Sequence, residues 1–259
     1  MFKPHKELGQ NFLTDRNVAK DMVEALDIQN GDEVVEIGPG RGVLTRFLAE
    51  KAMPFGESSS FKIHAVELDF RLYEELKKQY PESTGIEIIK ANILEWLPNF
   101  SSDKKIKIIG SVPYYITSPI IHKIIKMKKP PETAVLLVQK EVAKKIKSTA
   151  PDSSYMSSFV QTFFDVKYLG EVPSKKFDPE PKVDGGIIKM TRKEDANFDS
   201  VFIGKYEGFL HKAYSNPRKM LNKVFKKEEL ERVTINPALR AQNLNAGEWL
   251  NFYKKINEI

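Results

Sequence analysis

The chain has 259 residues, of which 41% are hydrophobic, and it carries a net charge of +6 with no cysteine. Such a composition is typical of a globular protein with one large domain, or with one large and one small domain, and it excludes a disulfide framework and a thiolate nucleophile or metal site. No apolar run reaches the length of a membrane span, and the first residues lack the apolar segment of a secretory signal, so we expect a cytoplasmic protein without a membrane partner.

The positive charge is concentrated in two regions. Residues 122–147 hold eight lysines and two glutamates, and residues 192–259 hold thirteen Lys or Arg against nine Asp or Glu. Two basic zones on a mildly acidic remainder indicate a polyanionic partner such as a nucleic acid. A solvated lysine-rich surface explains the same charges equally well, so charge alone does not decide between the two.

An ordered arm is predicted at residues 3–13. It combines two carboxamides, Gln10 and Asn11, with an apolar pair that ends at Leu13. Asp15 is a candidate N-cap for the amphipathic helix that follows. A helix before the first strand is an addition to a minimal βαβ unit, and its position allows it to cover a ligand cleft.

A buried parallel strand is predicted at residues 34–37, where β-branched side chains surround Glu36. Three glycines then alternate over residues 38–42, and an amphipathic helix begins at about Val43. In α/β proteins, a strand followed by a glycine turn and a helix commonly forms the binding site of a nucleotide-like ligand. The spacing is G-x-G-x-G and not the G-x-G-x-x-G of dinucleotide-binding proteins. With Glu36 inside the strand, it resembles the first motif of S-adenosylmethionine-dependent methyltransferases. The alternative is an ordinary glycine-rich turn between a strand and a helix.

The next two strands are predicted at residues 62–66 and 86–90, and polar side chains follow both. Glu67 is placed to hold a ribose hydroxyl pair, because a carboxylate accepts two O–H bonds. Its alternative role is that of a carboxylate at a helix N-terminus, although Asp69 fits the capping role better. Asn92 is suited to an adenine edge or, equally, to a turn.

A fourth strand, at residues 105–110, leads into a proline-stiffened turn with two adjacent aromatic rings. An exposed Tyr114 ring at a strand tip would be a stacking platform for a base. The alternative is that the tyrosines belong to the core of the next helix, which suits Tyr115 better.

The rest of the chain divides into a strand-containing and a purely helical part. We expect helices at residues 120–127 and 139–147, strands at 134–138 and 184–190, a helix or strand pair at 153–169, and an extended proline-rich stretch at 173–183. Phe177 in that stretch is either a cleft wall or a core residue.

A domain boundary is predicted where the composition shifts, between residues 190 and 191. Beyond it the periodicity is helical only. Asn216 followed by Pro217 is predicted to start a helix, and Asn245 with Glu248 to form the capping box of the last one.

Four separated stretches resemble the KsgA-type ribosomal RNA adenine dimethyltransferases, which are related to the Erm methylases. They occur in that family's order and spacing, at residues 6–13, 36–42, 111–114 and 177–183, and residues 216–219 also resemble the family. The resemblance covers essentially the whole chain. It implies an α/β fold, namely a Rossmann-like S-adenosylmethionine-dependent methyltransferase domain at residues 1–190 and a small all-helical, rRNA-binding domain at 191–259.

The resemblance also implies an activity, a partner and a set of site residues. The activity is dimethylation of two adjacent adenines near the 3′ end of small-subunit rRNA, in the immature subunit, by a monomer that needs no metal. The cofactor, S-adenosylmethionine, would be bound by Gln10, Asn11, Leu13, Glu36, Gly38, Gly40, Glu67, Asn92 and Ser111. The target base and the reaction would be handled by Ser111, Val112, Pro113, Tyr114 and Phe177.

Two positions depart from the family pattern. The family has aspartate at Asn92, where adenine needs only an acceptor, so we expect this change to be tolerated. At the position of Ser111 the family has an asparagine. The amide oxygen of that asparagine and the backbone carbonyl of the next residue, here Val112, accept hydrogen bonds from the adenine amino group. Serine is shorter, and a misplacement of ~1 Å can cost on the order of 10²-fold in rate, so we expect a slower enzyme. An Erm-like large-subunit rRNA methylase and a ribosome-assembly factor with weakened catalysis are the alternatives.

Overall fold

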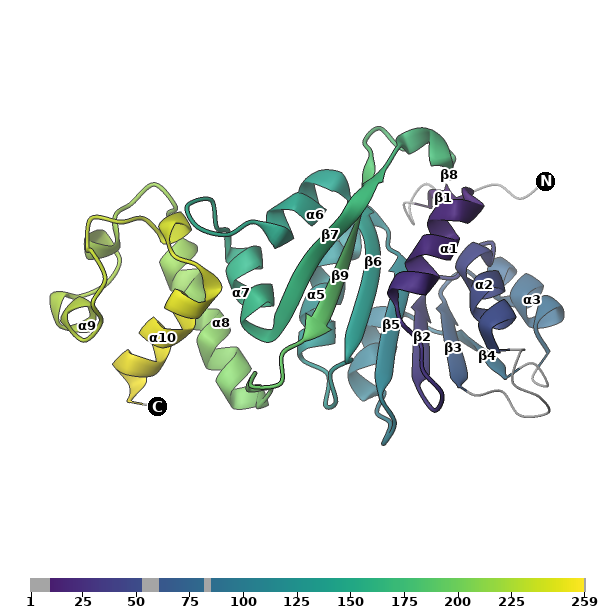
Figure 1. Cartoon of the computed structure of the whole chain (residues 1–259), viewed down its shortest axis with the longest axis horizontal. Helices are drawn as coiled ribbons and strands as arrows, with labels where there is room; N and C mark the ends of the chain where they lie inside the picture. The colour runs from purple at the N-terminus through teal and green to yellow at the C-terminus, as the bar shows by residue number, and fades with distance from the viewer. Residues whose placement is uncertain (1–9, 53–60, 82–84, 259) are drawn as a thin grey trace. The chain divides into compact units, whose positions relative to one another are not determined.

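The computed structural model describes residues 10–52, 61–81 and 85–258. The chain divides into two compact units (Figure 1): Met1–Ala143 with Lys167–Arg192, and Lys144–Val166 with Lys193–Ile259. The first part of the predicted arm, at residues 3–9, lies outside the described residues. The domain boundary predicted between residues 190 and 191 stays a prediction. In the structure the chain enters the second unit for the last time after Arg192.

A seven-stranded sheet forms the centre of the first unit. Its strand order is β4-β3-β2-β5-β6-β9-β7, with β2 at Glu33–Ile37, β3 at Lys62–Glu67, β4 at Ile86–Lys90, β5 at Ile106–Ser111, β6 at Thr133–Gln139, β7 at Phe164–Val172 and β9 at Gly185–Arg192. The five strands from β4 to β6 are parallel, and β9 is antiparallel to β6. The predicted Rossmann-like α/β fold is confirmed, and each strand predicted before residue 140 lies within one residue of its observed bounds.

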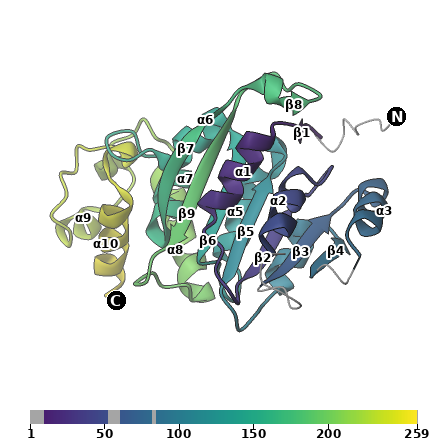
Figure 2. The same cartoon turned by 45° about the vertical axis from the view of Figure 1, so that its right-hand side comes forward.

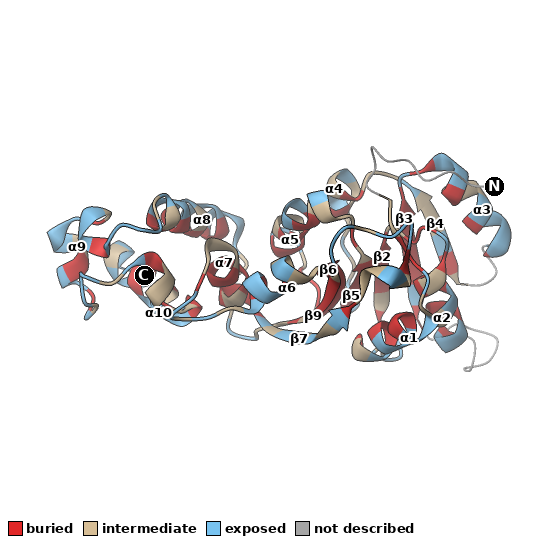
Figure 3. Cartoon of the chain, turned by 90° about the horizontal axis from the view of Figure 1, so that it is seen from above, coloured by how far each residue is buried: buried red, intermediate tan, exposed pale blue. Residues whose placement is uncertain are grey.

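Helices follow the strands and cover the sheet. They are α1 at Arg16–Ala25, α2 at Val43–Ala52, α3 at Phe70–Gln79, α4 at Ile93–Trp96, α5 at Thr117–Ile125 and α6 at Lys140–Lys147. Figure 3 shows α1 and α2 on one face of the sheet and α4 and α5 on the other. The Asp15 carboxylate accepts from the Val18 amide and Asp69 from the Arg71 amide, so both predicted N-caps are confirmed.

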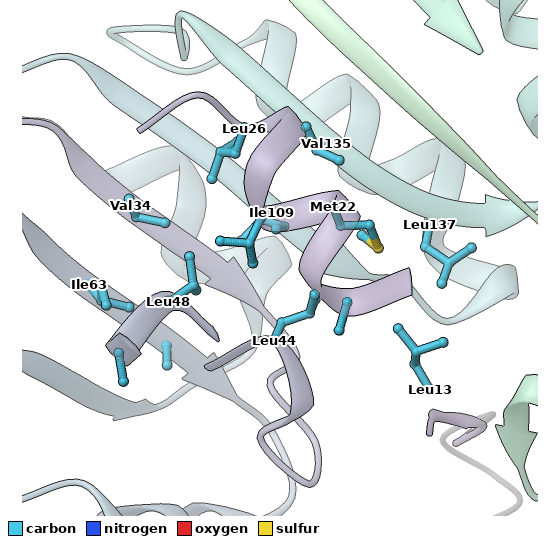
Figure 4. Packing of buried hydrophobic residues seen from close by; sticks show 14 of the residues in the cluster. Leu13, Met22, Leu26, Val34, Leu44, Leu48, Ile63, Ile109, Val135 and Leu137 are labelled. Atoms are coloured by element: carbon cyan, nitrogen blue, oxygen red, sulfur yellow. The ribbon is translucent and has the colours of Figure 1, made fainter. Parts of the chain in front are cut away.

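The main core of the first unit lies between α1, α2 and the sheet (Figure 4). Both helices are amphipathic, so the apolar side chains spaced by three or four residues along each helix lie on one face. These side chains pack against residues of four strands on the sheet face that α1 and α2 cover. The labelled examples are Met22, Leu26, Leu44 and Leu48 from the helices, and Val34, Ile63, Ile109, Val135 and Leu137 from the strands. This packing fixes the strand ends that carry the polar residues described below.

A separate two-stranded antiparallel ribbon lies beside the sheet in the first unit (Figure 2). It pairs β1, Phe12–Leu13, with β8, Phe177–Asp178, in the register Phe12 to Asp178 and Leu13 to Phe177. The proline-rich stretch at residues 173–183 was expected to be extended throughout. Ser174–Lys176 instead forms one turn of 3-10 helix, closed by a bond from the Lys176 amide to the Pro173 carbonyl.

Helices make up most of the regular structure in the described residues of the second unit. It contains α7 at Tyr155–Phe163, α8 at Ser200–Tyr214, α9 at Lys227–Glu231 and α10 at Ala246–Asn257, packed around large buried rings such as Tyr206, Trp249 and Phe252. The capping box of Asn245 and Glu248 is confirmed. Among the described helices of the whole chain, none combines the length and apolarity needed to cross a membrane.

The helix predicted to start at Asn216 is absent: residues 216–219 form a turn. The Lys219 amide bonds to the Asn216 carbonyl, and Met220 then adopts an extended conformation and forms a bridge with Arg240. The pairing of this distant segment explains why a local capping pattern did not become a helix.

Candidate active site

One pocket in the first unit collects most of the side chains singled out from the sequence. Its walls come from the arm at residues 10–12, the turn at 37–40 after β2, residues 66–68 after β3, residues 91–93 after β4, residues 111–116 after β5, and Phe177 of β8. Ligands of open α/β sheets bind at the carboxyl ends of the strands, where this pocket lies.

The glycine turn after β2 forms the floor of one half of the pocket. Gly38, Gly40 and Gly42 all have positive φ angles, of 61°, 58° and 77°. A Cβ on Gly38 would meet nothing within 4 Å, so open space for a ligand lies against this backbone. A Cβ on Gly40 would lie 2.9 Å from the Phe12 ring, so the arm packs directly on the turn.

Glu67, at the end of β3, ties the glycine turn to the next helix. Its Oε2 accepts from the Gly40 amide at 3.0 Å, and its Oε1 accepts from the Asp69 amide at 2.8 Å. Burial raises the pKa of this carboxyl group, although the two backbone amides oppose the shift. Each oxygen keeps a second lone pair for a ligand hydroxyl, because a carboxylate offers about four acceptor sites.

Gln10 is held in place by a charged pair. Its Nε2 donates to Asp69 Oδ2 at 3.0 Å, and the same oxygen accepts from Arg71 Nη2 at 2.7 Å. The Arg71 guanidinium holds the pKa of Asp69 well below its usual range. The arm is therefore fastened to the tip of β3, and Asn11 follows on the pocket wall.

Asn92 lines the pocket and also caps α4. Its Oδ1 accepts from the Leu94 amide at 3.0 Å and its Nδ2 donates to Glu95 Oε1 at 3.1 Å. The structure thus gives Asn92 a helix-capping role that was not predicted, and its contact with an adenine edge stays a prediction.

Two of the residues named for the cofactor do not line the pocket. Leu13 is buried in the main core, where it faces inward from β1. Glu36 is fully buried beneath the glycine turn, with its Oε2 accepting from Thr45 Oγ1 at 2.7 Å and its Oε1 without a partner among the described residues. Burial raises the pKa of Glu36 to about 8. Alternation along β2 explains its place, because Glu36 shares a face of the sheet with Val34, which packs in the main core, and that face meets Thr45 of α2.

The other half of the pocket is built on the end of β5. The Val112 amide donates to the Leu137 carbonyl at 2.9 Å, which anchors Ser111 and Pro113 on either side of it. Tyr114 begins a 3-10 turn, and its Oη is buried without a hydrogen-bond partner among the described residues. Burial, aided by the Asp184 carboxylate, raises the pKa of Tyr114 to about 12.

Tyr115 and several apolar residues are pocket residues that were not predicted from the sequence. A place in the core of the next helix was the alternative that suited Tyr115, but 58% of it is exposed and it lies on the pocket wall. Leu68, Leu72, Ile93 and Ile116 also line the pocket. The sequence signal that could have identified them is their position shortly after the ends of predicted strands.

An open, largely parallel sheet with a ligand pocket across its strand ends, floored by a G-x-G-x-G turn, defines a Rossmann-like protein of the methyltransferase type. A family model described as "Ribosomal RNA adenine dimethylase" matches residues 1–258. The chain belongs to this family.

Relatives of similar length carry one recurring name. The chain is 32% identical over 255 residues to the "Ribosomal RNA small subunit methyltransferase A" of Sulfurihydrogenibium sp. (strain YO3AOP1), covering 97% of this chain and 95% of the relative. It is 33% identical over 256 residues to the protein of the same name from Persephonella marina, covering 98% and 94%.

Solved structures show the same fold at lower identity. The dimethyladenosine transferase of Plasmodium falciparum superposes with a TM-score of 0.78 at 24% identity, covering 95% of this chain and 98% of that one. The 23S rRNA methyltransferase ErmE gives a TM-score of 0.74 at 22% identity, covering 95% and 100%.

Proposed function

We propose that this chain transfers methyl groups from S-adenosylmethionine to the exocyclic N6 atoms of two adjacent adenines near the 3′ end of small-subunit rRNA, in the immature subunit. The observation that carries the proposal is one continuous pocket with two different ends. The glycine turn and Glu67 lie at one end, and Ser111, Tyr114 and Phe177 lie at the other. The near full-length similarity to relatives named as small-subunit rRNA methyltransferases supports the choice of substrate.

The residues at the first end fit the cofactor. The open space at Gly38 suits the methionine part, because no side chain can block the approach to the backbone. Glu67 offers acceptors for ribose hydroxyls and Asn92 offers an amide edge for adenine, with Leu68 and Ile93 as apolar walls. When bound, S-adenosylmethionine supplies an electrophilic methyl group on a positively charged sulfur.

The residues at the second end suit a flipped or splayed adenine. Tyr114 would stack on the base, with Phe177 as the opposite wall. The adenine amino group is a weak nucleophile, and its nitrogen becomes tetrahedral and positive during the reaction. The Ser111 hydroxyl and the Val112 carbonyl would accept its two hydrogens, and they would bind the charged transition state more tightly than the neutral base. No general base is needed, since the proton is acidic once the nitrogen is cationic.

Methyl transfer from labelled cofactor to isolated RNAs tests the proposal. We expect labelling of immature small subunits, mapped to adjacent adenines, and none of large-subunit RNA. Tyr114→Ala should abolish most labelling, whereas Tyr73→Ala, which removes a ring on the surface of α3 outside the pocket wall, should leave it unchanged.

The two alternatives predict different results in the same assay. Labelling of large-subunit RNA alone would identify an Erm-like activity. Binding of immature small subunits without any labelling would identify an assembly factor with weakened catalysis, a candidate that Ser111 in place of asparagine keeps open.

A further inference from the structure

We propose that the β1–β8 ribbon, together with an ion pair between Arg41 and Asp178, couples cofactor binding to target-base binding, with Arg41 and Asp178 as positioning residues. The inference rests on the proposed function, because it assigns the two ends of the pocket to the two ligands. It adds a link between those ends that neither end needs for its own contacts.

The ribbon contributes one aromatic wall to each end of the pocket. Phe12 of β1 packs on the glycine turn, within 2.9 Å of the Cβ position of Gly40. Phe177 of β8 lies beside the start of β9, where its Cζ is 3.3 Å from the Cβ position of Gly185. Because β1 and β8 are hydrogen-bonded neighbours, a shift of one ring displaces the other.

Arg41 joins the glycine turn itself to this ribbon. It lies between Gly40 and Gly42, and its Nη1 donates to Asp178 Oδ2 at 2.7 Å. Its Cζ also lies 4.7 Å from the centroid of the Phe12 ring, a cation–π contact. One side chain therefore touches both strands of the ribbon from the turn that would hold the cofactor.

Other bonds hold the ribbon together without Arg41. The Thr14 amide and hydroxyl both donate to the Lys176 carbonyl, at 2.9 and 2.8 Å, and Lys176 Nζ lies 2.9 Å from Asp15 Oδ2. A variant that lacks the Arg41 side chain should thus keep the ribbon and the packing of Phe12 on Gly40, and lose the contacts of Arg41 with Asp178 and the Phe12 ring.

The expected effect is moderate. The side chains of Arg41 and Asp178 are 38% and 59% exposed, and pairs this exposed contribute little in water. We expect each single substitution to reduce the coupling factor by about two- to fivefold. Coupling between two ligands is reciprocal, so the factor is the same whichever ligand is titrated.

The experiment measures that factor by calorimetry. S-adenosylhomocysteine, the demethylated product, is titrated into the full chain with and without an RNA hairpin carrying the two adjacent adenines. The ratio of the two Kd values should exceed one for the unmodified chain. Arg41→Ala and the double variant should lower it equally, because both remove the ion pair and the contact of Arg41 with Phe12. Asp178→Ala, which leaves the Phe12 contact, should lower it by no more than these, and the exchanged pair Arg41→Asp with Asp178→Arg should restore part of it.

Arg46→Ala is the matched control. It removes another exposed ion pair, with Glu50 at 3.0 Å, from the helix that follows the glycine turn, and the ratio should not change. A ratio of one in the unmodified chain, additive effects of the two substitutions, or an equal loss in the Arg46 variant would overturn the coupling. Failure of the unmodified chain to bind either ligand would instead overturn the proposed function.

Discussion

Glu36 gives the sharpest prediction about stability. Its carboxyl group is fully buried, accepts from the Thr45 hydroxyl at Oε2, and has its Oε1 unpartnered among the described residues. Burial raises its pKa to about 8 in the folded chain, against a usual value of 4.5. The carboxyl is therefore protonated in the folded state near neutral pH and ionised in the unfolded state. Replacing it with glutamine removes the titration and keeps the shape.

The sign and size follow from proton linkage. Between pH 4.5 and pH 8 the folded chain binds one more proton than the unfolded chain, so the stability due to this group is complete below pH 4.5 and is lost as the pH rises toward 8. Each pH unit in this window is worth about 1.36 kcal/mol. Between pH 5 and pH 8, where each end is partly titrated, the loss amounts to about 3–4 kcal/mol.

Urea unfolding of the natural chain and the Glu36→Gln variant, at one-unit steps from pH 5 to pH 8, measures this loss. The variant should gain about 3–4 kcal/mol relative to the natural chain across the series, whatever its stability at pH 5. Glu50→Gln, on the exposed face of α2, is the control and should stay within about 0.5 kcal/mol throughout. If the Glu36 variant followed the natural chain at every pH, the buried carboxyl would not be protonated and the reasoning would be refuted.

Three further changes test the site. Ser111→Asn should raise the turnover of methyl transfer, because a longer acceptor reaches the adenine amino group; an unchanged or lower turnover would count against the assigned role. Glu67→Gln should weaken binding of the demethylated cofactor by about 5- to 150-fold, since the new NH₂ group would face a backbone amide donor; calorimetry that showed full affinity would remove Glu67 from the site. Gly40→Ala should lower stability by about 1–3 kcal/mol, because the residue has a φ of 58° and its Cβ would lie 2.9 Å from Phe12. Gly204→Ala, in an open position of α8, should not lower the Tm, and equal effects of the two would contradict this account.

Much of the fold could be predicted because the relevant signals are local. The β-branched run before Gly38 and the short, mostly apolar segment after Lys62 mark parallel strands, and Asp15 and Asp69 mark helix starts within one turn. The prediction of a helix starting at Asn216 was wrong because the deciding contact is not local. A bridge between Met220 and Arg240 redirects the chain, and no local pattern contains a partner twenty residues away.

The residue types of the site could be predicted from the sequence, but the hydrogen bonds and ion pairs between them could not. Residues at strand ends came together as expected, because parallel strands end at one edge of the sheet. The second contacts of these residues were not foreseeable: Glu67 binds the Gly40 amide, and Arg41 reaches Asp178, which is 137 positions away. The family resemblance assigned Glu36 to the cofactor, yet strand alternation places it on the face of the sheet that packs against α2.

The pairing of β1 with β8 has a consequence for biosynthesis. The first strand of the ribbon is made near the start of translation and its partner only after residue 176, and β9, which separates β6 from β7, follows later still. At about 5–20 residues per second, a nascent chain spends roughly ten seconds or more with the arm unpaired and the pocket missing a wall. Truncated chains that stop before residue 177 should therefore retain neither ligand, however well their earlier strands have folded.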